Sequence, residues 1–482
     1  MTNLSGADLK NGAAVGSQGE GMDSPSTFPA YPEYKDSRVE WLDTLPAQWE
    51  KVALKWVSRI FAGGTPDKTK THYWENGSIP WLNSGAVNQV LISEPSAFIT
   101  TEAFNSSSAR WIPSGSLVMA LAGQGKTKGM VAQLAIRTTC NQSMAAIIPV
   151  GNVKPRYLFW WLSNNYQNIR NMAGGDLRDG LNLELIGDIP ALMPSEEEQN
   201  QIAHFLDHET ARIDALIEEQ QRLIELLKEK RQAVIYHAVT KGLDPTVPMK
   251  DSGVEWLGKV PTHWRFGKIR YFAKIESGHT PSRSKPEYWE NCTIPWFSLA
   301  DVWQIRSGEM IELFQTKELV SELGLANSSA RLLPKGTVIL SRTASVGYSA
   351  IMGCDMATTQ DFVNWICGDK LDNKFLLFCF RAMKSEFDRL MVGSTHKTIY
   401  MPDIAELVCS VPPLDEQEKI AAHIKISNSK FGSMIEEADR MMKLLSERRS
   451  ALISAAVTGK IDVRSWQPPA NAQSPEVAQE TV

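Results

Sequence analysis

The sequence predicts an α/β (α+β) protein of two tandem globular domains, each followed by a long helix, with the two helices packing as an antiparallel coiled coil. Three observations predict this architecture. Residues 195–241 form the longest uninterrupted helical pattern in the chain. A second pattern of the same kind occupies residues 413–462, and the stretches ahead of the two helices repeat one another. Two copies of a domain with an attached helix therefore account for most of the chain.

Composition agrees with a globular protein of more than one domain, since 482 residues exceed one ordinary core. The formal net charge of -5 argues against indiscriminate binding of polyanions, although a local basic face is compatible with it. The six cysteines include no Cys-x-x-Cys pair, which indicates reduced thiols. No secretory pattern opens the chain, and no apolar run approaches the roughly 18 residues of a membrane helix. A cytoplasmic protein without membrane contact is therefore expected.

The first domain is predicted over residues 34–194, after an N-terminal tail over residues 1–33. The tail is rich in Gly, Ser, Asp and Asn and shows no periodicity, which is typical of disorder. In the domain, short apolar runs at 117–122 and 145–150 are separated by Gly, Asn and Pro and are expected to be strands. Residues 154–169 are expected to be helical.

The central helix is predicted over residues 195–245. Ser195 with Glu198 three positions later matches a capping box, and Gly242 is a plausible stop. The apolar residues step by threes, fours and sevens, so they form one narrow stripe, which Gln220 and Arg231 interrupt. A stripe this narrow suits packing against one partner helix. Its members are Ile213, Ile217, Ile224, Leu227, Val234 and Ala238.

A second domain is predicted over residues 250–412, because adding 215 to every number from 35 to 81 gives 21 identities in 47 positions without a gap. The long helix returns at an offset of 218, over residues 413–462, and a second tail follows at 467–482. The repeated stripes predict where the helices meet. The expected interface residues are Ile217, Ile224, Leu227, Val234, Ile435, Met442, Leu445 and Leu452.

Motifs of catalysis are incomplete in this sequence. Gly125-Lys126-Thr127 looks like the end of a phosphate loop, but Ala120 stands where the first glycine is required. His204 and His208 have metal-ligand spacing, yet Phe205 occupies the position of a protease general base, so two helix-face histidines are the simpler interpretation. A nuclease motif and an amino-methyltransferase motif are incomplete as well. We expect no catalytic residue, no cofactor site and no metal site on this chain.

The repeated motifs resemble those of the specificity subunit of type I restriction–modification systems, over about residues 34 to 466. Lys35 and Lys250 each open a Lys-Asp-Ser-x-Val-Glu-Trp-Leu segment, and Glu198 and Glu416 each open a Glu-Gln-x-x-Ile-Ala helix start. Thr-Pro and Tyr-Trp-Glu-Asn segments also occur in both halves. The long tail departs from the family pattern, as does Pro-Ser before the first Glu-Gln, where the second copy has Pro-Pro-Leu.

This resemblance implies a DNA-binding subunit without catalytic activity, whose two target recognition domains each read one half of a bipartite target. The helices would set the spacer and dock modification (methyltransferase) subunits, two in number, and restriction (translocase/nuclease) subunits would join them. S-adenosylmethionine and ATP would bind these partners. The alternatives are a coiled-coil scaffold with peptide-binding domains and a stand-alone nuclease or methyltransferase. A salt-dependent, sequence-specific gel shift of double-stranded DNA, with modification subunit added, would distinguish the scaffold from the DNA-binding subunit.

Basic and polar residues in the predicted loops are the expected DNA contacts, although ordinary surface charge remains an alternative for each. In the first domain the Gly-rich loop at 123–129 would let lysines approach phosphate, and a glutamine there could read a base edge. The candidates are Gln124, Lys126, Lys128 and Arg178 in the first domain, and Arg342, His396 and Lys397 in the second.

Overall fold

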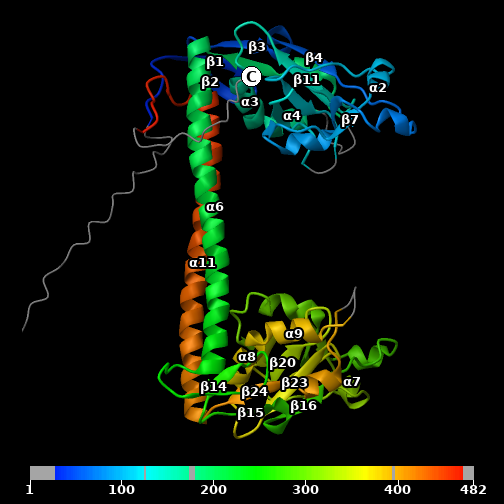
Figure 1. Cartoon of the computed structure of the whole chain (residues 1–482), viewed down its shortest axis with the longest axis vertical. Helices are drawn as coiled ribbons and strands as arrows, with labels where there is room; N and C mark the ends of the chain where they lie inside the picture. Colours follow the sequence, from blue (N-terminus) through cyan, green and yellow to red (C-terminus); the bar gives the residue numbers. More distant parts are fainter. Residues whose placement is uncertain (1–27, 124–125, 173–179, 393–396, 470–482) are drawn as a thin grey trace, which may run out of the picture. The chain divides into compact units, whose positions relative to one another are not determined.

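The computed structural model describes residues 28–123, 126–172, 180–392 and 397–469 (Figure 1). The chain divides into two compact units: unit 1 comprises Met1–Glu218 and Lys443–Val482, and unit 2 comprises Glu219–Met442. The division cuts both long helices, α6 (Glu196–Lys241) and α11 (Leu414–Val457), so each unit holds one globular domain and part of each helix.

The domain of unit 1 is built on a five-stranded sheet in the order β4-β11-β8-β9-β6, antiparallel except between β6 and β9. A three-stranded sheet, β10-β5-β7, and the pairs β1-β2 and β3-β12 complete it. The strands are β1 (Tyr34–Val39), β2 (Leu42–Pro46), β3 (Glu50–Ala53), β4 (Ser58–Ala62), β5 (Ile79–Leu82), β6 (Leu91–Ile92), β7 (Ala97–Ile99), β8 (Leu117–Ala120), β9 (Val131–Leu134), β10 (Thr139–Cys140), β11 (Met144–Pro149) and β12 (Pro190–Met193).

Unit 2 repeats this topology strand for strand. Its five-stranded sheet has the order β16-β23-β20-β21-β18, its three-stranded sheet the order β19-β17-β22, and two pairs accompany them. The strands are β13 (Met249–Asp251), β14 (Lys259–Pro261), β15 (Arg265–Lys268), β16 (Ala273–Ser277), β17 (Ile294–Phe297), β18 (Glu312–Leu313), β19 (Glu318–Val320), β20 (Val338–Ser341), β21 (Ser349–Met352), β22 (Ala357–Thr358), β23 (Phe362–Cys367) and β24 (Val408–Val411).

Both faces of each five-stranded sheet are buried, and the alternation of side chains along a strand explains how. In β8, Leu117 and Met119 belong to one apolar cluster, while Val118 and Ala120 belong to another on the opposite face. Strand β20 divides its side chains between two clusters in the same way. These continuous apolar runs are therefore central strands. The sequence predicted a strand over 117–122, and β8 confirms it.

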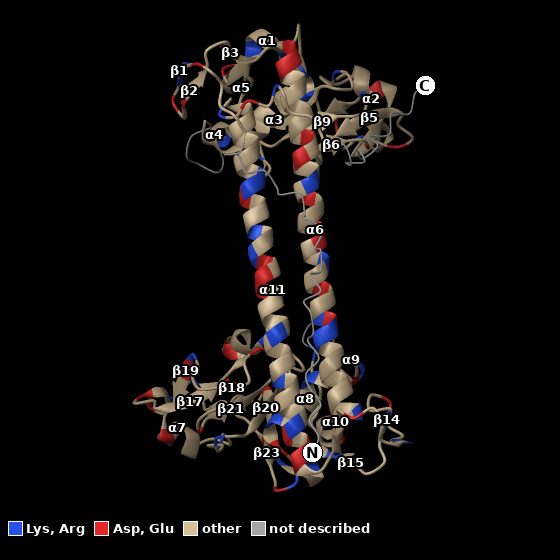
Figure 2. Cartoon of the chain, turned by 90° about the vertical axis from the view of Figure 1, so that its left-hand side faces the viewer, with Lys and Arg blue, Asp and Glu red and all other residues tan. Residues whose placement is uncertain are grey.

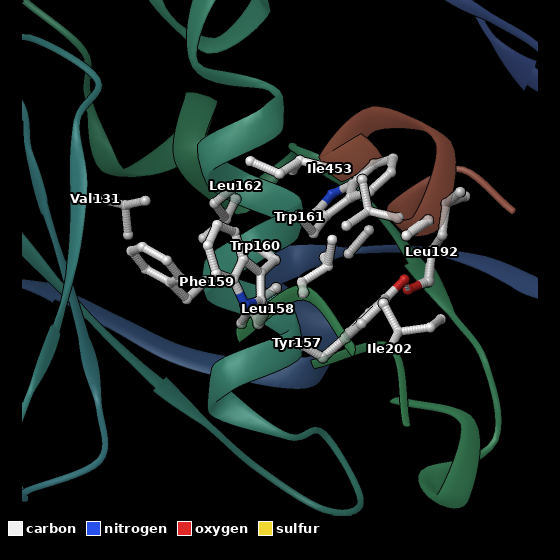
Figure 3. Packing of buried hydrophobic residues seen from close by; sticks show 14 of the residues in the cluster. Val131, Tyr157, Leu158, Phe159, Trp160, Trp161, Leu162, Leu192, Ile202 and Ile453 are labelled. Atoms are coloured by element: carbon white, nitrogen blue, oxygen red, sulfur yellow. Dashed lines mark hydrogen bonds between the residues drawn. The ribbon is translucent and has the colours of Figure 1, made fainter. Parts of the chain in front are cut away.

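Short helices cover the sheets and connect the strands. Helix α3 is buried on nearly all sides. Figure 3 shows Tyr157 and Trp161 on the side of Leu192, Ile202 and Ile453, and Phe159 on the side of Val131. Trp161 donates its indole N–H to the Pro190 carbonyl at 2.9 Å, so its polar atom is satisfied within the core. The helices are α1 (Leu54–Val57), α2 (Thr101–Asn105), α3 (Pro155–Asn164), α4 (Tyr166–Asn171), α5 (Leu183–Gly187), α7 (Glu322–Ala326), α8 (Asn373–Ala382), α9 (Lys384–Leu390) and α10 (Met401–Ala405).

Helix α6 begins one residue after Ser195 and ends at Lys241, as the predicted stop at Gly242 requires, so the predicted segment over residues 195–245 is four residues too long at its end. Helix α11 likewise ends at Val457, five residues before the predicted end at 462. The first turn of α6 differs from the prediction in one contact. The Ser195 hydroxyl accepts the Glu198 N–H at 3.2 Å, as in a capping box. The Glu198 carboxylate, however, accepts the Tyr31 hydroxyl at 2.6 Å. At the other end Gly242 adopts a φ of +78° and donates to the Ala238 carbonyl, which ends the helix.

Within unit 1 the first part of α6 packs against the last part of α11. Ile213 and Leu452 lie in one buried cluster, with Ile217 packed at its edge. Asp214 of α6 accepts two hydrogen bonds from the Arg449 guanidinium of α11, at 2.8 and 3.1 Å. Because the early residues of one helix meet the late residues of the other, the helices run antiparallel, which confirms the predicted pairing.

Within unit 2 the last part of α6 packs against the first part of α11. Ile235 and Ala238 share a buried cluster with Ile420 and Ile424, so the helices are antiparallel here too. Basic residues (Lys, Arg) and acidic residues (Asp, Glu) both occur along the length of both helices (Figure 2). Of the expected interface residues, Ile224, Leu227, Leu445 and Leu452 are buried, and Ile217, Val234, Ile435 and Met442 are half-buried.

The N-terminal segment is packed from residue 28 onward, which corrects the predicted tail over residues 1–33. The Phe28 ring lies edge-on to Phe205 of α6 at 5.2 Å, and Tyr31 is 3% exposed. Trp466, beyond α11, packs against the same cluster. The cover for these side chains comes from helices far away in the sequence, so composition alone could not reveal it. The rest of both predicted tails, 1–27 and 470–482, lies outside the described residues.

No helix in the described parts of the chain combines the length and the apolar character that a bilayer crossing requires.

Candidate nucleic-acid interface

One edge of the five-stranded sheet in unit 1 gathers loops that are far apart in the sequence. Strand β4 ends beside the start of β11, because Ala62 pairs with Ala145. Strand β8 ends at the same edge, because Ala120 pairs with Met144, and β9 starts there opposite β8. The loops at 63–66, 121–130 and 141–143 therefore lie along this edge, which we call rim 1.

Main-chain hydrogen bonds join the loops of rim 1. The Gly64 N–H donates to the Cys140 carbonyl at 2.8 Å, and the Leu181 N–H donates to the Leu121 carbonyl at 2.8 Å. Burial raises the pKa of the Cys140 thiol to about 12, so this cysteine stays protonated and packs as an apolar side chain. Main-chain hydrogen bonds therefore join the loops of rim 1, and the Cys140 thiol beside them is a buried packing residue.

Two predicted contacts lie in the loop between β8 and β9 and differ in exposure. Lys126 is exposed, and its carbonyl accepts the Tyr166 hydroxyl of α4 at 2.5 Å. Arg170 of α4 donates to the same Tyr166 oxygen at 3.0 Å. Lys128 is 4% exposed, which differs from the expected exposed phosphate contact. The reason is that the loop folds back onto α4 through Gly129, whose φ is +84°.

Unit 2 has the equivalent edge, rim 2. Strands β16 and β20 end beside the start of β23, since Ser277 pairs with Val363 and Ser341 pairs with Phe362. Strand β21 starts at this edge, opposite β20. The loops at 278–281, 342–348 and 359–361 therefore lie along rim 2.

Rim 2 brings together two of the predicted residues, Arg342 and Lys397. The Ala344 N–H donates to the Lys397 carbonyl at 2.9 Å, and the Ile399 N–H donates to the Arg342 carbonyl at 2.9 Å. The half-buried Arg342 guanidinium donates to the Gln360 carbonyl at 3.0 Å and so braces the loop, whereas Lys397 is exposed. The remaining predicted contacts, Gln124, Arg178 and His396, lie outside the described residues.

The largest difference in length between the loops of rims 1 and 2 is in the β8–β9 loop and its counterpart, the β20–β21 loop. The connection between β8 and β9 spans residues 121–130, ten residues, whereas the connection between β20 and β21 spans residues 342–348, seven residues. The sheets that carry the loops have the same strand order. A shared frame therefore presents two loops of different length and sequence.

Sequence reasoning overlooked one polar contact that both rims share. The Thr65 hydroxyl donates to Gln142 Oε1 at rim 1, and the Thr280 hydroxyl donates to Gln360 Oε1 at 2.7 Å at rim 2. Both glutamines are exposed. The available signal was that the same residue types, Thr and Gln, occur at corresponding positions of the two copies, although packing does not require an exposed glutamine.

The two histidines with metal-ligand spacing pack around a tryptophan. The His204 and His208 rings lie 5.7 and 5.3 Å from the ring of Trp466, and His208 also pairs with Glu209 at 3.0 Å. Among the described residues, no three His, Cys, Asp or Glu side chains are grouped as metal ligands would be. The contacts of both histidines are those of helix-face packing residues.

Comparison with known proteins gives a family for both copies. The family described as type I restriction modification DNA specificity domain matches residues 46–226 and again residues 261–430. The MjaIX specificity subunit of a type I restriction enzyme from Methanocaldococcus jannaschii is 29% identical over 193 residues, 40% of this chain and 43% of that protein. The EcoR124I/EcoR124II specificity subunit from Escherichia coli is 27% identical over 201 residues, 41% and 47% of the two chains. The matched region thus spans less than half of either relative.

Solved structures share the fold over a larger part of the chain. A structure from a study of assembly and conformational transition of the type I R-M system gives a TM-score of 0.63 at 18% identity, over 86% of this chain and 99% of that one. The HsdS subunit from Thermoanaerobacter tengcongensis gives 0.54 at 16% identity, over 86% and 98%. At these identities the structures support the fold alone.

The family model covers well over half of the residues, in two copies that coincide with the two repeated domains and the start of each long helix. This chain therefore belongs to the family of type I restriction modification DNA specificity domains.

Proposed function

We propose that this chain is the DNA-specificity subunit of a type I restriction–modification complex, in which each unit reads one half of a bipartite target. The observation that carries the proposal is the repeated rim. Rims 1 and 2 share their strand ends and their Thr–Gln contact, but the connecting loops differ by three residues in length, ten against seven. Two like frames with unlike loops suit two unlike half-sites on one duplex.

The proposed DNA contacts are the exposed basic residues at the rims. Lys126 at rim 1 and Lys397 at rim 2 are exposed, which supports their proposed contact with phosphate, and Gln124, Arg178 and His396 remain proposed contacts from the sequence. Arg342 has a different role in the proposal, because its guanidinium already holds a main-chain carbonyl of rim 2. It would fix the shape of the reading loop.

The long helices offer docking surfaces for two modification subunits. Leu223 and Leu226 of α6 are 39% and 53% exposed, and at an offset of 218 Met441 and Leu444 of α11 are 42% and 54% exposed. Exposed apolar side chains at equivalent positions of a repeat suit one partner surface used twice. The glutamate pairs at 218–219 and 436–437, also exposed, would add a polar rim to each surface.

Catalysis in this proposal belongs to the partners. The modification subunits would bind S-adenosylmethionine, the restriction subunits would bind ATP, and this chain would supply neither a cofactor site nor a catalytic group. All six cysteines are free, and a cytoplasmic location beside the chromosome suits reduced thiols.

The test of DNA readout begins with methylome sequencing of the host with and without this protein, which identifies the target. A duplex with that target and a scrambled duplex of equal length and composition are then titrated with the chain and its modification subunit. We expect tighter binding to the target duplex, weakening as salt rises. Equal affinity for the two duplexes at every salt concentration would refute the proposal.

The docking surfaces are tested with Leu226→Glu and Leu444→Glu. Each places a charge in one proposed contact, so native mass spectrometry should find one modification subunit bound in place of two. Glu225→Ala, an exposed neighbour of Leu226, is the matched control and should leave two bound. Two bound subunits with Leu226→Glu and Leu444→Glu combined would contradict docking through these residues.

A further inference from the structure

Each rim continues into an exposed loop with two basic residues. In unit 1 the loop follows Thr65 and Pro66, and all its residues from 67 to 72 are exposed. Its basic residues are Lys68 and Lys70, which correspond to Arg283 and Lys285 at an offset of 215. Exposed loop residues are normally free to vary. Basic side chains kept at both positions of an exposed loop therefore suggest a shared ligand.

In unit 1 two tryptophan side chains anchor the loop at 67–72 and the residues before it through hydrogen bonds to main-chain carbonyls. The Trp81 indole donates to the Gly64 carbonyl at 3.0 Å, and the Trp74 indole donates to the Asp67 carbonyl at 3.2 Å. The two indole rings pack edge to face with centroids 5.0 Å apart. The Asp67 carboxylate turns back to accept the main-chain N–H and the hydroxyl of Thr69, so it shapes the loop.

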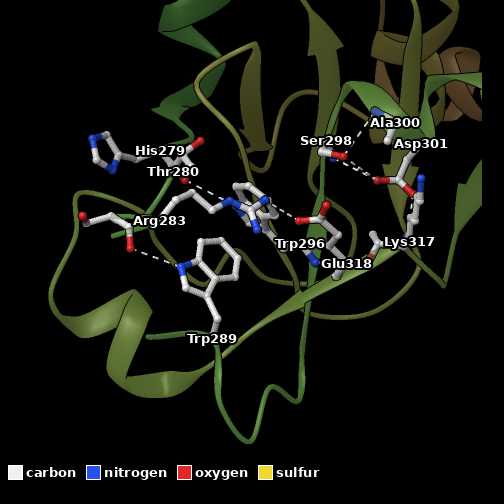
Figure 4. Close-up of polar contacts among 12 residues, drawn as sticks. His279, Thr280, Arg283, Trp289, Trp296, Ser298, Ala300, Asp301, Lys317 and Glu318 are labelled. Carbon is white, nitrogen blue, oxygen red and sulfur yellow. Dashed lines mark hydrogen bonds and ion pairs between the residues drawn. The ribbon is translucent and has the colours of Figure 1, made fainter. Parts of the chain in front are cut away.

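Unit 2 repeats the same anchors, as Figure 4 shows. The Trp296 indole donates to the His279 carbonyl at 3.3 Å, and the Trp289 indole donates to the Ser282 carbonyl at 3.2 Å. The Arg283 guanidinium stacks on the Trp289 ring, 3.8 Å from its centroid. Arg283 also forms an ion pair with Glu318, so a neighbouring acid offsets its charge.

The second basic residue is positioned identically in the two units. Lys70 Nζ donates to the Tyr73 hydroxyl at 3.1 Å, and Lys285 Nζ donates to the Tyr288 hydroxyl at 3.2 Å. Both tyrosines are buried, which fixes the direction of each lysine, and the partner is a neutral phenol. A lysine ammonium has three donors, so this contact leaves capacity for an anion. Pre-positioning also lowers the side-chain entropy that binding would cost.

We infer that Lys70 and Lys285 are phosphate-binding residues, one in each unit, that grip the DNA backbone independently of base sequence. This inference rests on the proposed function and adds that different residues bind the DNA backbone and read the bases. A ligand feature common to two unlike half-sites must be the sugar–phosphate backbone, which identical residues in both units can bind. The loops at 121–130 and 342–348, which differ between the units, are left to read the bases.

The experiment uses Lys70→Gln, Lys285→Gln and the double variant in the full chain with its modification subunit. Binding to the target duplex and to the scrambled duplex is measured over a series of salt concentrations. Lys55→Gln is the matched control: Lys55 is an exposed lysine of unit 1 that precedes β4, at the end of that strand opposite to rim 1. Thermal melting of each variant checks that the fold is retained.

We expect the slope of log K against log salt to become shallower by about 0.9 for each single variant and by about 1.8 for the double variant. Affinity for the two duplexes should fall by the same factor, with the ratio between them unchanged. Unchanged slopes, slopes equal to that of Lys55→Gln, or a loss confined to the target duplex would each overturn the inference. A wild type that treats both duplexes alike would instead count against the proposed function, so the two failures are distinguishable.

Discussion

At the residue scale, a glycine opens the first loop of each rim, because another segment of main chain lies too close there for any side chain. A Cβ on Gly63 would lie 2.1 Å from the Cys140 carbonyl oxygen, and a Cβ on Gly278 would lie 2.0 Å from that of Thr359. Both distances are shorter than any Cβ tolerates without movement of the main chain. These glycines let the main chain pass close to Cys140 and Thr359 as it leaves β4 and β16. Two residues after each glycine, a threonine hydroxyl donates to the glutamine of the same rim.

The acid stability of unit 1 should depend on Asp462. Arg464 donates to both of its carboxylate oxygens, at 2.9 and 2.6 Å, and this holds the pKa of Asp462 below its ordinary value of 3.8. A carboxyl whose pKa is lower in the folded state stabilises the fold above its unfolded pKa, and this stability is lost as the pH falls through the folded pKa. We expect Asp462→Asn to lower the free energy of unfolding by about 0.5–1 kcal/mol near neutral pH, because solvent screens the pair.

Denaturant titrations at neutral pH and below the folded pKa check this expectation, since the difference between variant and wild type should vanish in acid. Asp439→Asn, at an exposed position of α11, is the control for the loss of a charge. A difference that stays constant down to low pH would show that the Asp462–Arg464 pair does not carry it.

At the scale of elements, the long helices behave as the sequence predicted because their apolar stripe is periodic. Positions three, four and seven apart lie on one face of a helix whatever surrounds it. The structure adds which part of each helix packs where. The first part of α6 and the last part of α11 complete the core of unit 1, and their other parts complete the core of unit 2.

An unpaired charge in the stripe should be costly. Leu227 is 6% exposed in unit 2 and Leu445 is 5% exposed in unit 1. Burying a carboxylate there without a partner should lower the free energy of unfolding by about 3 kcal/mol or more, whereas an exposed change should cost under about 1 kcal/mol. We expect Leu227→Asp or Leu445→Asp to loosen the helix pair and abolish binding to the full target.

Thermal melting and titration with the target duplex measure the two effects, and Glu225→Ala serves as the exposed control. If Leu227→Asp matches the wild type in melting temperature and affinity, the helices do not pack through this stripe.

At the scale of the whole molecule, each domain is completed by the helix end of the other copy. The chain that leaves α6 places Gly242 against Trp264 of unit 2, and the chain that leaves α11 places Gly459 against Trp49 of unit 1. Unit 1 is therefore built from two separate stretches of sequence. Each domain nevertheless has its own sheets and its own core.

Separate cores make the domains exchangeable. Replacing residues 83 to 190 with the same segment of a relative carries the β8–β9 loop of rim 1 and leaves unit 2 untouched. Methylome sequencing should then show one half of the target changed and the other kept. Changes in both halves would exclude independent reading by the two units.

A continuous α6 also predicts an effect of its length. Inserting four residues near Gln220 adds about 6 Å to the helix at 1.5 Å per residue, so the unread spacer in the methylated target should become longer. An active variant that methylates the original spacing would show that α6 does not set it.

The sequence by itself determined the repeat, the two long helices with their stripes, and the stop at Gly242. Each of these is carried by periodicity, by internal identity or by a single conformational requirement, all of which are local properties of the chain. The repeat also places Gln142 and Gln360 at corresponding positions in the two copies. Nothing in a local pattern, however, states which distant segment covers a residue.

Tertiary structure alone decided that Lys128 is buried, that Arg342 braces a loop, and that Phe28 and Tyr31 belong to the core of unit 1. It also decided that Thr65 meets Gln142, 77 positions later in the chain. Strand pairing brings such residues together, and strand pairing depends on the whole sheet. A basic loop residue can therefore be recognised from sequence, but whether its charge faces solvent or the protein depends on the neighbours that the fold supplies.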